Sequence, residues 1–288
     1  MLLLDKPLSA SSNRALQIAK RLFNAEKAGH TGTLDPLASG LLPICFGEAT
    51  KFASLMLEAD KRYSAVLKLG QTTTTGDAEG EIVETRPVEV EVAGIEKVLA
   101  GFRGQIRQTP PMHSALKHKG KPLYAYVRKG IEIERPERIV TISELVFEGL
   151  EGCELSISVA CSKGTYVRVL AEDIGRALGC GAHLKSLIRT GTGPFELENA
   201  HDLGEIENRE DRDGMLLDCD SMLQGFEKLD FGEHDADFLM NGRKIESGAR
   251  PGPYRAYDSA GRFLGLVEAD NEGIIRPKRM MSGNFCLR

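Results

Sequence analysis

The sequence predicts an α+β protein with a mixed, largely antiparallel sheet, followed by a small β-rich C-terminal domain. Up to about residue 195, alternating apolar runs suited to strands are interspersed with amphipathic helical stretches. An acidic stretch over 196–237 then marks a domain boundary. Beyond about residue 230, short β-like runs alternate with Gly, Asn and Pro, which is typical of a small all-β module. We therefore expect two domains, 1–228 and 229–288, which suits a chain of 288 residues.

The first elements expected along the chain are a short strand and an amphipathic helix. Residues 2–4 are three leucines that suit a strand, and Pro7 breaks it. A serine or asparagine within 11–13 can then cap a helix. One face of that helix carries Leu16, Ala19 and Phe23.

The segment 29–36 is a turn-rich loop that contains two glycines, a histidine, two threonines and an aspartate. Its last two residues, Asp35 and Pro36, fit an N-cap followed by proline at the first helical position, so we expect a helix to start there. Taken alone, this spacing favours Asp35 as a helix cap over Asp35 as a catalytic group. The cap, however, gives no role to His30.

The later elements follow from the same rules of periodicity. Residues 63–69 and 155–161 alternate as strands, and in the first of these Tyr63 shares the apolar face. Helices are expected over 94–102 and from about Tyr166 to Leu178, where a glycine ends the second one.

Charge is unevenly distributed along the chain. The formal net charge is −5, but residues 196–237 hold 15 acidic side chains against three basic ones, which leaves +7 for the rest. Residues 103–138 hold nine Lys or Arg against three Glu. This stretch is also poor in periodicity, so we expect a long loop with a short helix near Tyr124–Arg128. A basic loop of this length can meet nucleic-acid phosphates, although a solvated surface would explain the charge equally well.

Several classes of protein are excluded by what the sequence lacks. No run approaches the roughly 18 apolar residues that span a bilayer, and the opening Met1–Leu4 is too short for a signal peptide, so we expect a cytoplasmic protein. The six cysteines form no Cys-x-x-Cys pair, and the six histidines form no His-Glu-x-x-His motif. We expect no metal site, no disulfide framework and no cofactor, with Cys45 and Cys161 as buried thiols.

The loop that begins at Gly29 carries a resemblance to a known family. Gly29-His30-Thr31-Gly32-Thr33-Leu34-Asp35-Pro36-Leu37-Ala38-Ser39-Gly40 closely resembles the catalytic-loop motif of the TruB-type tRNA pseudouridine synthases. Further blocks match in the same order, and together they cover roughly residues 2–195. These blocks are Leu3–Pro7 with Ser11–Asn13, Lys61–Tyr63, Pro111–Lys117, Cys161–Arg168 and Gly179–Leu184.

The resemblance implies a fold as well as an activity. It implies the pseudouridine-synthase fold for 1–228, with 103–138 as an RNA-facing basic insertion, and a PUA-like RNA-binding domain for 229–288. Two departures stand out. The chain has Ser9 where the family usually has glycine, and the tail is short for a PUA module.

The implied activity is the isomerisation of uridine to pseudouridine at position 55, in the T-loop of tRNA. Such an enzyme detaches uracil from C1′ of the ribose, turns it and reattaches it through C5, with no cofactor. Because the target base lies inside a folded T-arm, it must be flipped out, at a cost of a few kcal/mol. The implied partner is tRNA, bound through the T-arm by a monomer that needs neither a metal nor a membrane.

The resemblance assigns the chemistry to Asp35, as the catalytic carboxylate, and pairs Arg168 with it. A bidentate guanidinium would hold that carboxylate ionised and oriented. Glycosidases usually use two carboxylates, and no second one is evident near the motif. Without the family, Arg168 would be read as a surface residue of a helix.

Four further side chains receive substrate-binding roles from the resemblance. Tyr63 stacks on the target base, Tyr166 hydrogen-bonds near the reacting centre, and Leu187 lines the uracil pocket. His30 fills the space that the flipped nucleotide leaves, or contacts that nucleotide. Ordinary core packing would also explain the tyrosines and Leu187, and a bond to a backbone carbonyl would also explain His30.

The residues expected to contact RNA are mostly basic and lie mostly in 103–138. They are Lys6, His113, Lys117, Lys119, Lys121, Arg128 and Lys129.

Two other functions remain open at this point. One is a non-catalytic RNA-binding or tRNA-folding protein that uses the same basic loop. The other is a glycoside or nucleoside hydrolase built on Asp35, which would release free uracil.

Overall fold

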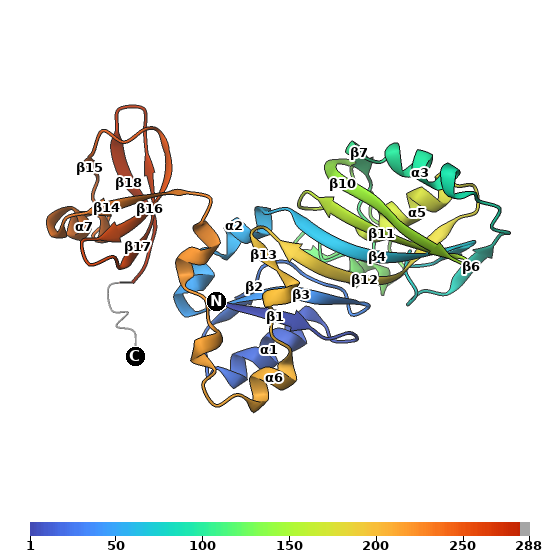
Figure 1. Cartoon of the computed structure of the whole chain (residues 1–288), viewed down its shortest axis with the longest axis horizontal. Helices are drawn as coiled ribbons and strands as arrows, with labels where there is room; N and C mark the ends of the chain where they lie inside the picture. Colours follow the sequence, from blue (N-terminus) through green and yellow to red (C-terminus); the bar gives the residue numbers. More distant parts are fainter. Residues whose placement is uncertain (283–288) are drawn as a thin grey trace.

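The computed structural model describes residues 1–282, and Figure 1 shows them as two lobes. The larger lobe is built on one mixed sheet, and the C-terminal strands form the smaller lobe beside it. The last six residues of the expected 229–288 domain lie outside the described residues.

Nine strands of the described chain form the main sheet, in the order β1-β3-β12-β4-β11-β10-β7, with β2 on β3 and β13 on β12. Neighbouring strands are antiparallel, except that β3 and β12 run parallel. The prediction of a mixed, largely antiparallel sheet is therefore confirmed. The strands are β1 (Leu2–Lys6), β2 (Ala28–His30), β3 (Ala38–Phe46), β4 (Lys61–Leu69), β7 (Gly104–Gln108), β10 (Arg138–Glu151), β11 (Glu154–Cys161), β12 (Ala182–Thr192) and β13 (Phe195–Glu196), and two smaller hairpins contain β5 (Gln71–Thr73) with β6 (Ile82–Thr85) and β8 (Lys117–His118) with β9 (Lys121–Pro122).

Helices pack against this sheet in two places. α3 and α5 cover the strands β4, β10, β11 and β12, and a large apolar core lies between them (Figure 1). α1 and α6 pack against β1, β2 and β3 around a second core. The helices of this lobe are α1 (Ser12–Leu22), α2 (Ala53–Glu58), α3 (Val92–Ala100), α4 (Tyr124–Val127), α5 (Val167–Ala177) and α6 (Leu203–Asn208), with 3-10 turns η1 (Gly47–Lys51), η2 (Leu197–Asn199), η3 (Asp213–Met215) and η4 (Cys219–Leu223).

Local patterns predict most of these elements correctly. Ser11 caps α1, since its side chain accepts a hydrogen bond from the Arg14 N–H at 3.2 Å. Ala65 and Leu67 of β4 lie in the core because alternate strand positions share one face. Gly179 has a φ of 83° and follows the end of α5, as expected for a glycine that ends a helix.

One local prediction is wrong, because no helix begins at Asp35. Asp35 and Pro36 lie in a turn that is closed by a hydrogen bond from the Ala38 N–H to the Asp35 carbonyl at 3.1 Å, and β3 follows directly. β3 is mostly buried and pairs with strands on both sides. Burial of an apolar run in a central strand therefore overrides the capping signal.

The expected long loop over 103–138 is also only partly a loop. Its start forms β7, which pairs with β10, and Arg138 already belongs to β10. Pairing with a distant strand supplies an order that periodicity cannot reveal. The short helix expected near Tyr124–Arg128 is present as α4. We call the remaining stretch, residues 109–137, the insertion.

The smaller lobe is β-rich, but the all-β prediction is wrong because α7 packs on its five-stranded sheet. Ala236 and Leu239 of α7 enter the core of this lobe. Acidic residues at 233, 235 and 237 occupy much of this short helix and obscure its apolar pattern. The elements are β14 (Glu227–Phe231), α7 (Glu233–Met240), β15 (Ile245–Glu246), β16 (Gly252–Asp258), β17 (Phe263–Ala269) and β18 (Ile274–Met280).

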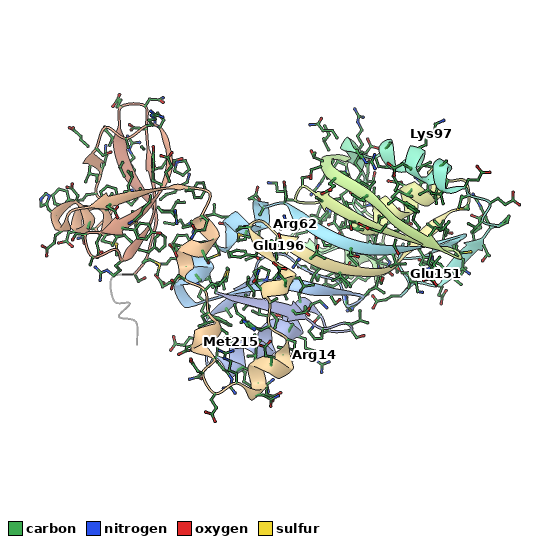
Figure 2. All side chains as sticks on the ribbon, in the orientation of Figure 1. Arg14, Arg62, Lys97, Glu151, Glu196 and Met215 are labelled. Atoms are coloured by element: carbon green, nitrogen blue, oxygen red, sulfur yellow. The ribbon has the colours of Figure 1, made fainter. Side chains whose placement is uncertain are left out.

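The two lobes share apolar packing at their junction. Phe52 and Met56 of the larger lobe lie in one core with Leu266 of β17. The ring centroids of Phe52 and Phe263 are 5.6 Å apart. Nearby, Arg62 and Glu196, labelled in Figure 2, form an ion pair that joins β4 to β13. The smaller lobe is therefore docked on the larger one through a common core.

Within residues 1–282, no helix is long and apolar enough to cross a membrane.

Candidate active site

The loop that carries Asp35 joins β2 to β3, beside the parallel pairing of β3 with β12. Ser12 fixes this loop, because its buried hydroxyl donates to the Leu34 carbonyl at 2.8 Å and accepts from the Leu34 N–H at 2.7 Å. The Ser9 N–H donates to the Pro36 carbonyl at 2.8 Å. The Asp35 side chain itself remains 46% exposed. A substrate can therefore reach a carboxylate whose backbone is held on both sides.

Ser9 occupies the turn where the TruB-type motif usually has glycine. Its φ of 65° lies in the left-handed region, which glycine adopts at lower cost than serine. The turn therefore keeps the path that a glycine would allow, with the strain carried by the serine.

Arg168, in the first turn of α5, pairs with Asp35 through Nη2, which lies 2.8 Å from Oδ2. The expected bidentate pairing is absent among the described contacts. Instead, Nη1 lies 3.5 Å from Asp77 Oδ2 and donates to the Thr75 carbonyl at 3.3 Å, while Nη2 also donates to the His113 carbonyl at 2.7 Å. The guanidinium is divided between two carboxylates and two carbonyls, because a buried fork of N–H groups needs several acceptors.

Asp77 is the second carboxylate that sequence reasoning did not find. Its side chain is 4% exposed, and its Oδ1 accepts from the Thr75 hydroxyl at 2.5 Å and from the Glu79 N–H at 3.1 Å. A carboxylate enclosed in this way can compensate the charge of Arg168 but does not meet a substrate. The signal in the sequence is the Thr- and Gly-rich turn 72–76 just before it, which gives no hint of the distant arginine.

The two tyrosines approach the site from different elements. Tyr63 lies on β4 in register with Arg189 of β12, and burial raises its pKa although the positive charge of Arg189 opposes the shift. Tyr166 precedes α5 and is clamped by Gln108, which accepts from the Tyr166 N–H at 3.1 Å and donates to its carbonyl at 3.3 Å. Burial raises the pKa of Tyr166 as well. Both phenols are therefore neutral at pH 7 and able to stack or donate.

Leu187 and Arg189 lie on β12, where it pairs with both β3 and β4. Leu187 is half-buried against the core of the main sheet. Arg189 is 1% exposed, and its Nε donates to the Leu41 carbonyl at 2.7 Å while its Nη2 donates to the Gly32 carbonyl at 3.1 Å. Sequence reasoning did not single out Arg189, because a lone arginine on a strand is usually a surface residue.

His30 ends β2, just before the Asp35 loop. Burial, together with the positive charge of Arg189, lowers the pKa of its imidazole. Its Nδ1 is buried and has no hydrogen-bond partner among residues 1–282, so a bond from this atom to a backbone carbonyl is absent there. His30 is thus a neutral ring at pH 7 with unused hydrogen-bonding capacity.

Comparison with known proteins covers this site and nearly the whole chain. Residues 20–167 match the model of the TruB family pseudouridylate synthase N-terminal domain, and 168–227 match that of the tRNA pseudouridylate synthase B C-terminal domain. The chain belongs to the TruB family. Residues 229–281 match a further model, described as pseudouridine synthase II TruB, C-terminal. Membership makes the chain a pseudouridine synthase, as the sequence motifs predict.

Individual relatives of this TruB protein are similar along nearly their full length. The tRNA pseudouridine synthase B of Thiobacillus denitrificans is 52% identical over 285 residues, which cover 98% of this chain and 95% of the relative. The tRNA pseudouridine synthase B of Methylobacillus flagellatus is 50% identical over 285 residues, which cover 98% of this chain and 94% of the relative.

Solved structures agree with the fold. The structure titled "Crystal Structure of a Cbf5-Nop10-Gar1 Complex" superposes with a TM-score of 0.72 at 25% identity, covering 94% of this chain and 78% of that one. A second structure, titled "Crystal structure of the archaeal box H/ACA sRNP Nop10-Cbf5 complex", superposes with a TM-score of 0.73 at 22% identity. The match covers 98% of this chain and 86% of that one. The predicted pseudouridine-synthase fold is therefore confirmed.

Lys6 does not fit its expected role as an RNA contact of the TruB chain. It is fully buried, and its Nζ donates to the Pro7 carbonyl at 2.9 Å and to the Ala10 carbonyl at 2.6 Å. Burial lowers its pKa, and the negative charge of Asp35 opposes that shift. Lys6 therefore stabilises the turn that is hydrogen-bonded to the Asp35 loop, because its buried strand directs the ammonium inward.

The insertion presents the other predicted RNA contacts. His113 is half-buried and holds Arg168 through its backbone carbonyl, as described above. The lysines and the arginine are exposed, and the Arg128 guanidinium lies 5.6 Å from the centre of the Tyr124 ring. No ion pair involves any of these five cations in the part of the chain that the structure describes. The exposed cations are Lys117, Lys119, Lys121, Arg128 and Lys129.

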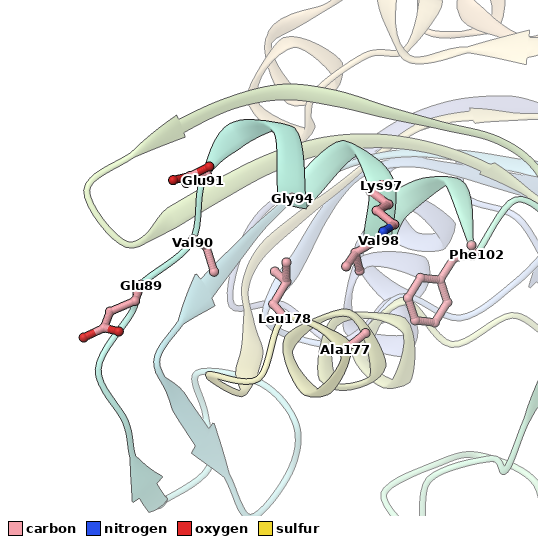
Figure 3. Close-up of a pocket in the computed structure, with 10 residues that line it drawn as sticks. Glu89, Val90, Glu91, Gly94, Lys97, Val98, Phe102, Ala177 and Leu178 are labelled. Atoms are coloured by element: carbon pink, nitrogen blue, oxygen red, sulfur yellow. The ribbon is translucent and has the colours of Figure 1, made fainter.

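Two cavities differ in their relation to the site. A mainly apolar cavity of about 580 Å³ lies between α3 and α5, lined by side chains such as Val98, Phe102 and Leu178 (Figure 3), and includes none of the predicted site residues. A polar cavity of about 620 Å³ is lined by Thr75 and His113, whose carbonyls hold Arg168. The second cavity adjoins the site. Within residues 1–282, no group of three His, Cys, Asp or Glu is placed to hold a metal ion.

Proposed function

We propose that this chain converts uridine to pseudouridine at position 55, in the T-loop of tRNA, with Asp35 as the catalytic carboxylate. The observation that carries the proposal is the exposed Asp35 carboxylate, fixed by its backbone and paired at 2.8 Å with the buried Arg168. This pairing lies in a chain of the TruB family whose relatives are named tRNA pseudouridine synthase B.

The chemistry needs one ionised carboxylate and a site that retains the base. Asp35 attacks C1′ or stabilises an oxocarbenium-like centre there while the bond between C1′ and N1 of uracil breaks. The uracil then turns, C5 bonds to C1′ as any bond from Asp35 to C1′ breaks, and the base loses its C5 proton while N1 gains one. Arg168 supports this step because its positive charge stabilises the carboxylate, and Tyr63 offers a neutral ring on which the flipped base stacks.

Hydrolysis on Asp35 is the less favoured alternative. A hydrolase of this type needs a second carboxylate that activates water or protonates a leaving group. Asp77 does not suit that role, because it is enclosed and already faces Arg168. We therefore infer that water is not activated at this site and that the detached uracil is kept and reattached.

Several further properties belong to the same proposal. We propose that the tRNA is bound through its T-arm by a monomer in the cytoplasm, with His30 and Leu187 around the flipped nucleotide. We also propose the division into a catalytic unit over 1–228 and a PUA-like RNA-binding unit from 229. This boundary is supported by the family models, which meet between 227 and 229.

The decisive experiment compares Asp35→Asn with the wild-type chain on unmodified tRNA, with no metal or cofactor added. Asn preserves the shape but not the charge, so we expect pseudouridine formation to fall by at least about 1000-fold. Affinity for tRNA should stay within a few-fold. Asp213→Asn, at an exposed aspartate of η3, is the matched control and should behave as wild type. Full activity of Asp35→Asn, or release of free uracil by the wild type, would contradict the proposal.

A further inference from the structure

Arg189 is a buried cation with no opposite charge against it. It is 1% exposed, and no ion pair involves it within residues 1–282. A buried charge is normally paired, because removing it from water is costly and an opposite charge offsets that cost. A neutral side chain could be buried here at a lower cost in free energy. The charge and shape of Arg189 therefore indicate a specific role.

The hydrogen bonds of Arg189 span the loop that carries Asp35. Its Nη2 donates to the carbonyl of Gly32, before Asp35, and its Nε donates to the carbonyl of Leu41, after it. The guanidinium is planar and rigid, so one group fixes the separation of these two carbonyls. The two ends of the loop are thereby tied to one point on β12.

A glycine on each side of Asp35 lies against Arg189. Gly32 has a φ of 124°, and a Cβ there would lie 3.4 Å from Nη1 of Arg189. Gly40 has a φ of 98°, and a Cβ there would lie 2.5 Å from the backbone oxygen of Arg189. Two glycines of the loop motif thus lie where β12 and its arginine pass closely.

Arg189 also faces two of the proposed substrate-binding residues. Its backbone is in register with Tyr63 on the neighbouring strand β4. Its charge acts on His30 of β2, where it joins burial in lowering the pKa of the imidazole. One cation therefore contacts or influences the loop of Asp35, the Tyr63 strand and the His30 ring.

We propose that Arg189 is a positioning residue for the isomerisation, which fixes the Asp35 loop relative to Tyr63 and to the base stacked on it. The proposal rests on the function proposed above, in which Asp35 is the catalytic carboxylate. A displacement of about 1 Å between a catalytic group and its substrate can reduce a rate about 100-fold. The hydrogen bonds from Arg189 to the loop should therefore affect the chemical step rather than binding.

The test uses Arg189→Lys and Arg189→Met in the full chain, with single-turnover rates measured at saturating tRNA. Lysine keeps the charge but cannot span two carbonyls, so we expect a loss of about 10- to 100-fold. Methionine removes both the charge and the two hydrogen bonds to carbonyls, and we expect the single-turnover rate to fall by about 100- to 1000-fold. The dissociation constant for tRNA should stay within about threefold, because neither variant alters an exposed contact.

Two readouts separate positioning from a general loss of stability. Hydrogen exchange of residues 31–41 should accelerate in both variants. It should not accelerate in Ile157→Ala, which opens a cavity in the core of the same sheet and serves as the control. The pKa of His30, followed by NMR, should rise in Arg189→Met and stay near the wild-type value in Arg189→Lys.

Wild-type rates and wild-type exchange of the loop in both Arg189 variants would overturn the proposal. So would losses no larger than in Ile157→Ala with equal exchange. If the methionine variant does not fold, the lysine variant and its loop exchange decide the question. If the wild-type chain forms no pseudouridine, the proposed function fails, and loop exchange with the His30 titration still decides whether Arg189 holds the loop.

Discussion

Two regions of the molecule are expected to meet the same RNA, and they are built in opposite ways. The floor, which we define as β3, β4 and β12 with the loop 31–37, is fixed by buried hydrogen bonds from Ser12 and Arg189 to its backbone. The insertion presents exposed cations, and its His113 carbonyl accepts from Arg168, which also pairs with Asp35 of the floor. The difference teaches that bond breaking needs fixed geometry, whereas attraction of phosphates needs only charge.

The largest effect expected from this comparison is at Arg168, where floor and insertion meet. Arg168→Lys keeps a positive charge but cannot reach two carboxylates and two carbonyls at once. We expect the single-turnover rate to fall by about 100- to 1000-fold, with tRNA affinity within a few-fold. The matched control is Arg176→Lys, near the other end of α5, where the arginine is exposed and pairs with Asp173. A wild-type rate for Arg168→Lys would show that the contacts of the guanidinium with two carboxylates and two carbonyls are not needed for the reaction.

The second effect is on stability and tests a buried charge within the floor. Lys61 of β4 is 7% exposed, its ammonium donates to the Leu57 carbonyl at 2.8 Å, and burial lowers its pKa to about 8. Between pH 8 and 10.5 the folded chain has lost this proton while the unfolded chain still binds it, so stability rises with pH over that interval. Relative to Lys61→Met, wild type should gain on the order of 3 kcal/mol in unfolding free energy.

Urea unfolding at pH 7.5 and at pH 10 measures this gain. Lys68→Met provides the control, because Lys68 lies on the same strand with its side chain partly exposed. The difference in unfolding free energy between wild type and Lys68→Met should be the same at both pH values. A difference between wild type and Lys61→Met that does not change with pH would mean that the folded chain keeps this proton.

The smallest expected effect is in the insertion. Replacing Lys117, Lys119 and Lys121 by Ala should weaken tRNA binding about tenfold at moderate salt. The slope of log K against log salt should flatten by about 2 to 3, since each lost phosphate contact removes about 0.7 to 0.9. The rate at saturating tRNA should not change. Lys97→Ala, on the outer side of α3, is the control (Figure 2). An unaltered slope in the triple variant would remove the insertion from the interface.

Sequence alone predicts the parts of this molecule that depend on local rules. The cap at Ser11, the alternation of β4 and the glycine after α5 all follow from short-range preferences. The family, and with it Asp35 and Arg168, follows from ordered motifs. The start of β3 is not predicted, because the residues at Asp35 and Pro36 favour a helix cap. Its strand conformation depends on burial between two partner strands, which the local sequence does not show.

The remaining features of the site depend on contacts between distant segments. Asp77 and Arg189 lie outside the sequence motifs, and each has a place at the site only because the fold brings a turn or a strand to the Asp35 loop. Lys6 shows the reverse case. It looks like a free cation in the sequence, yet the strand that bears it directs its ammonium into the protein.

The parallel pairing of β3 with β12 has a consequence for the order in which the protein becomes functional. The hydrogen bond from Arg189 to Leu41 joins residues 148 positions apart, and the same pairing positions the Asp35 loop. Contacts of such long range form late, since the loop they close must first lose its conformational freedom. On the ribosome, the chain must grow past β12 before this loop can take its place. Competence for catalysis should therefore arise together with completion of the sheet, so that incompletely synthesised chains do not act on RNA.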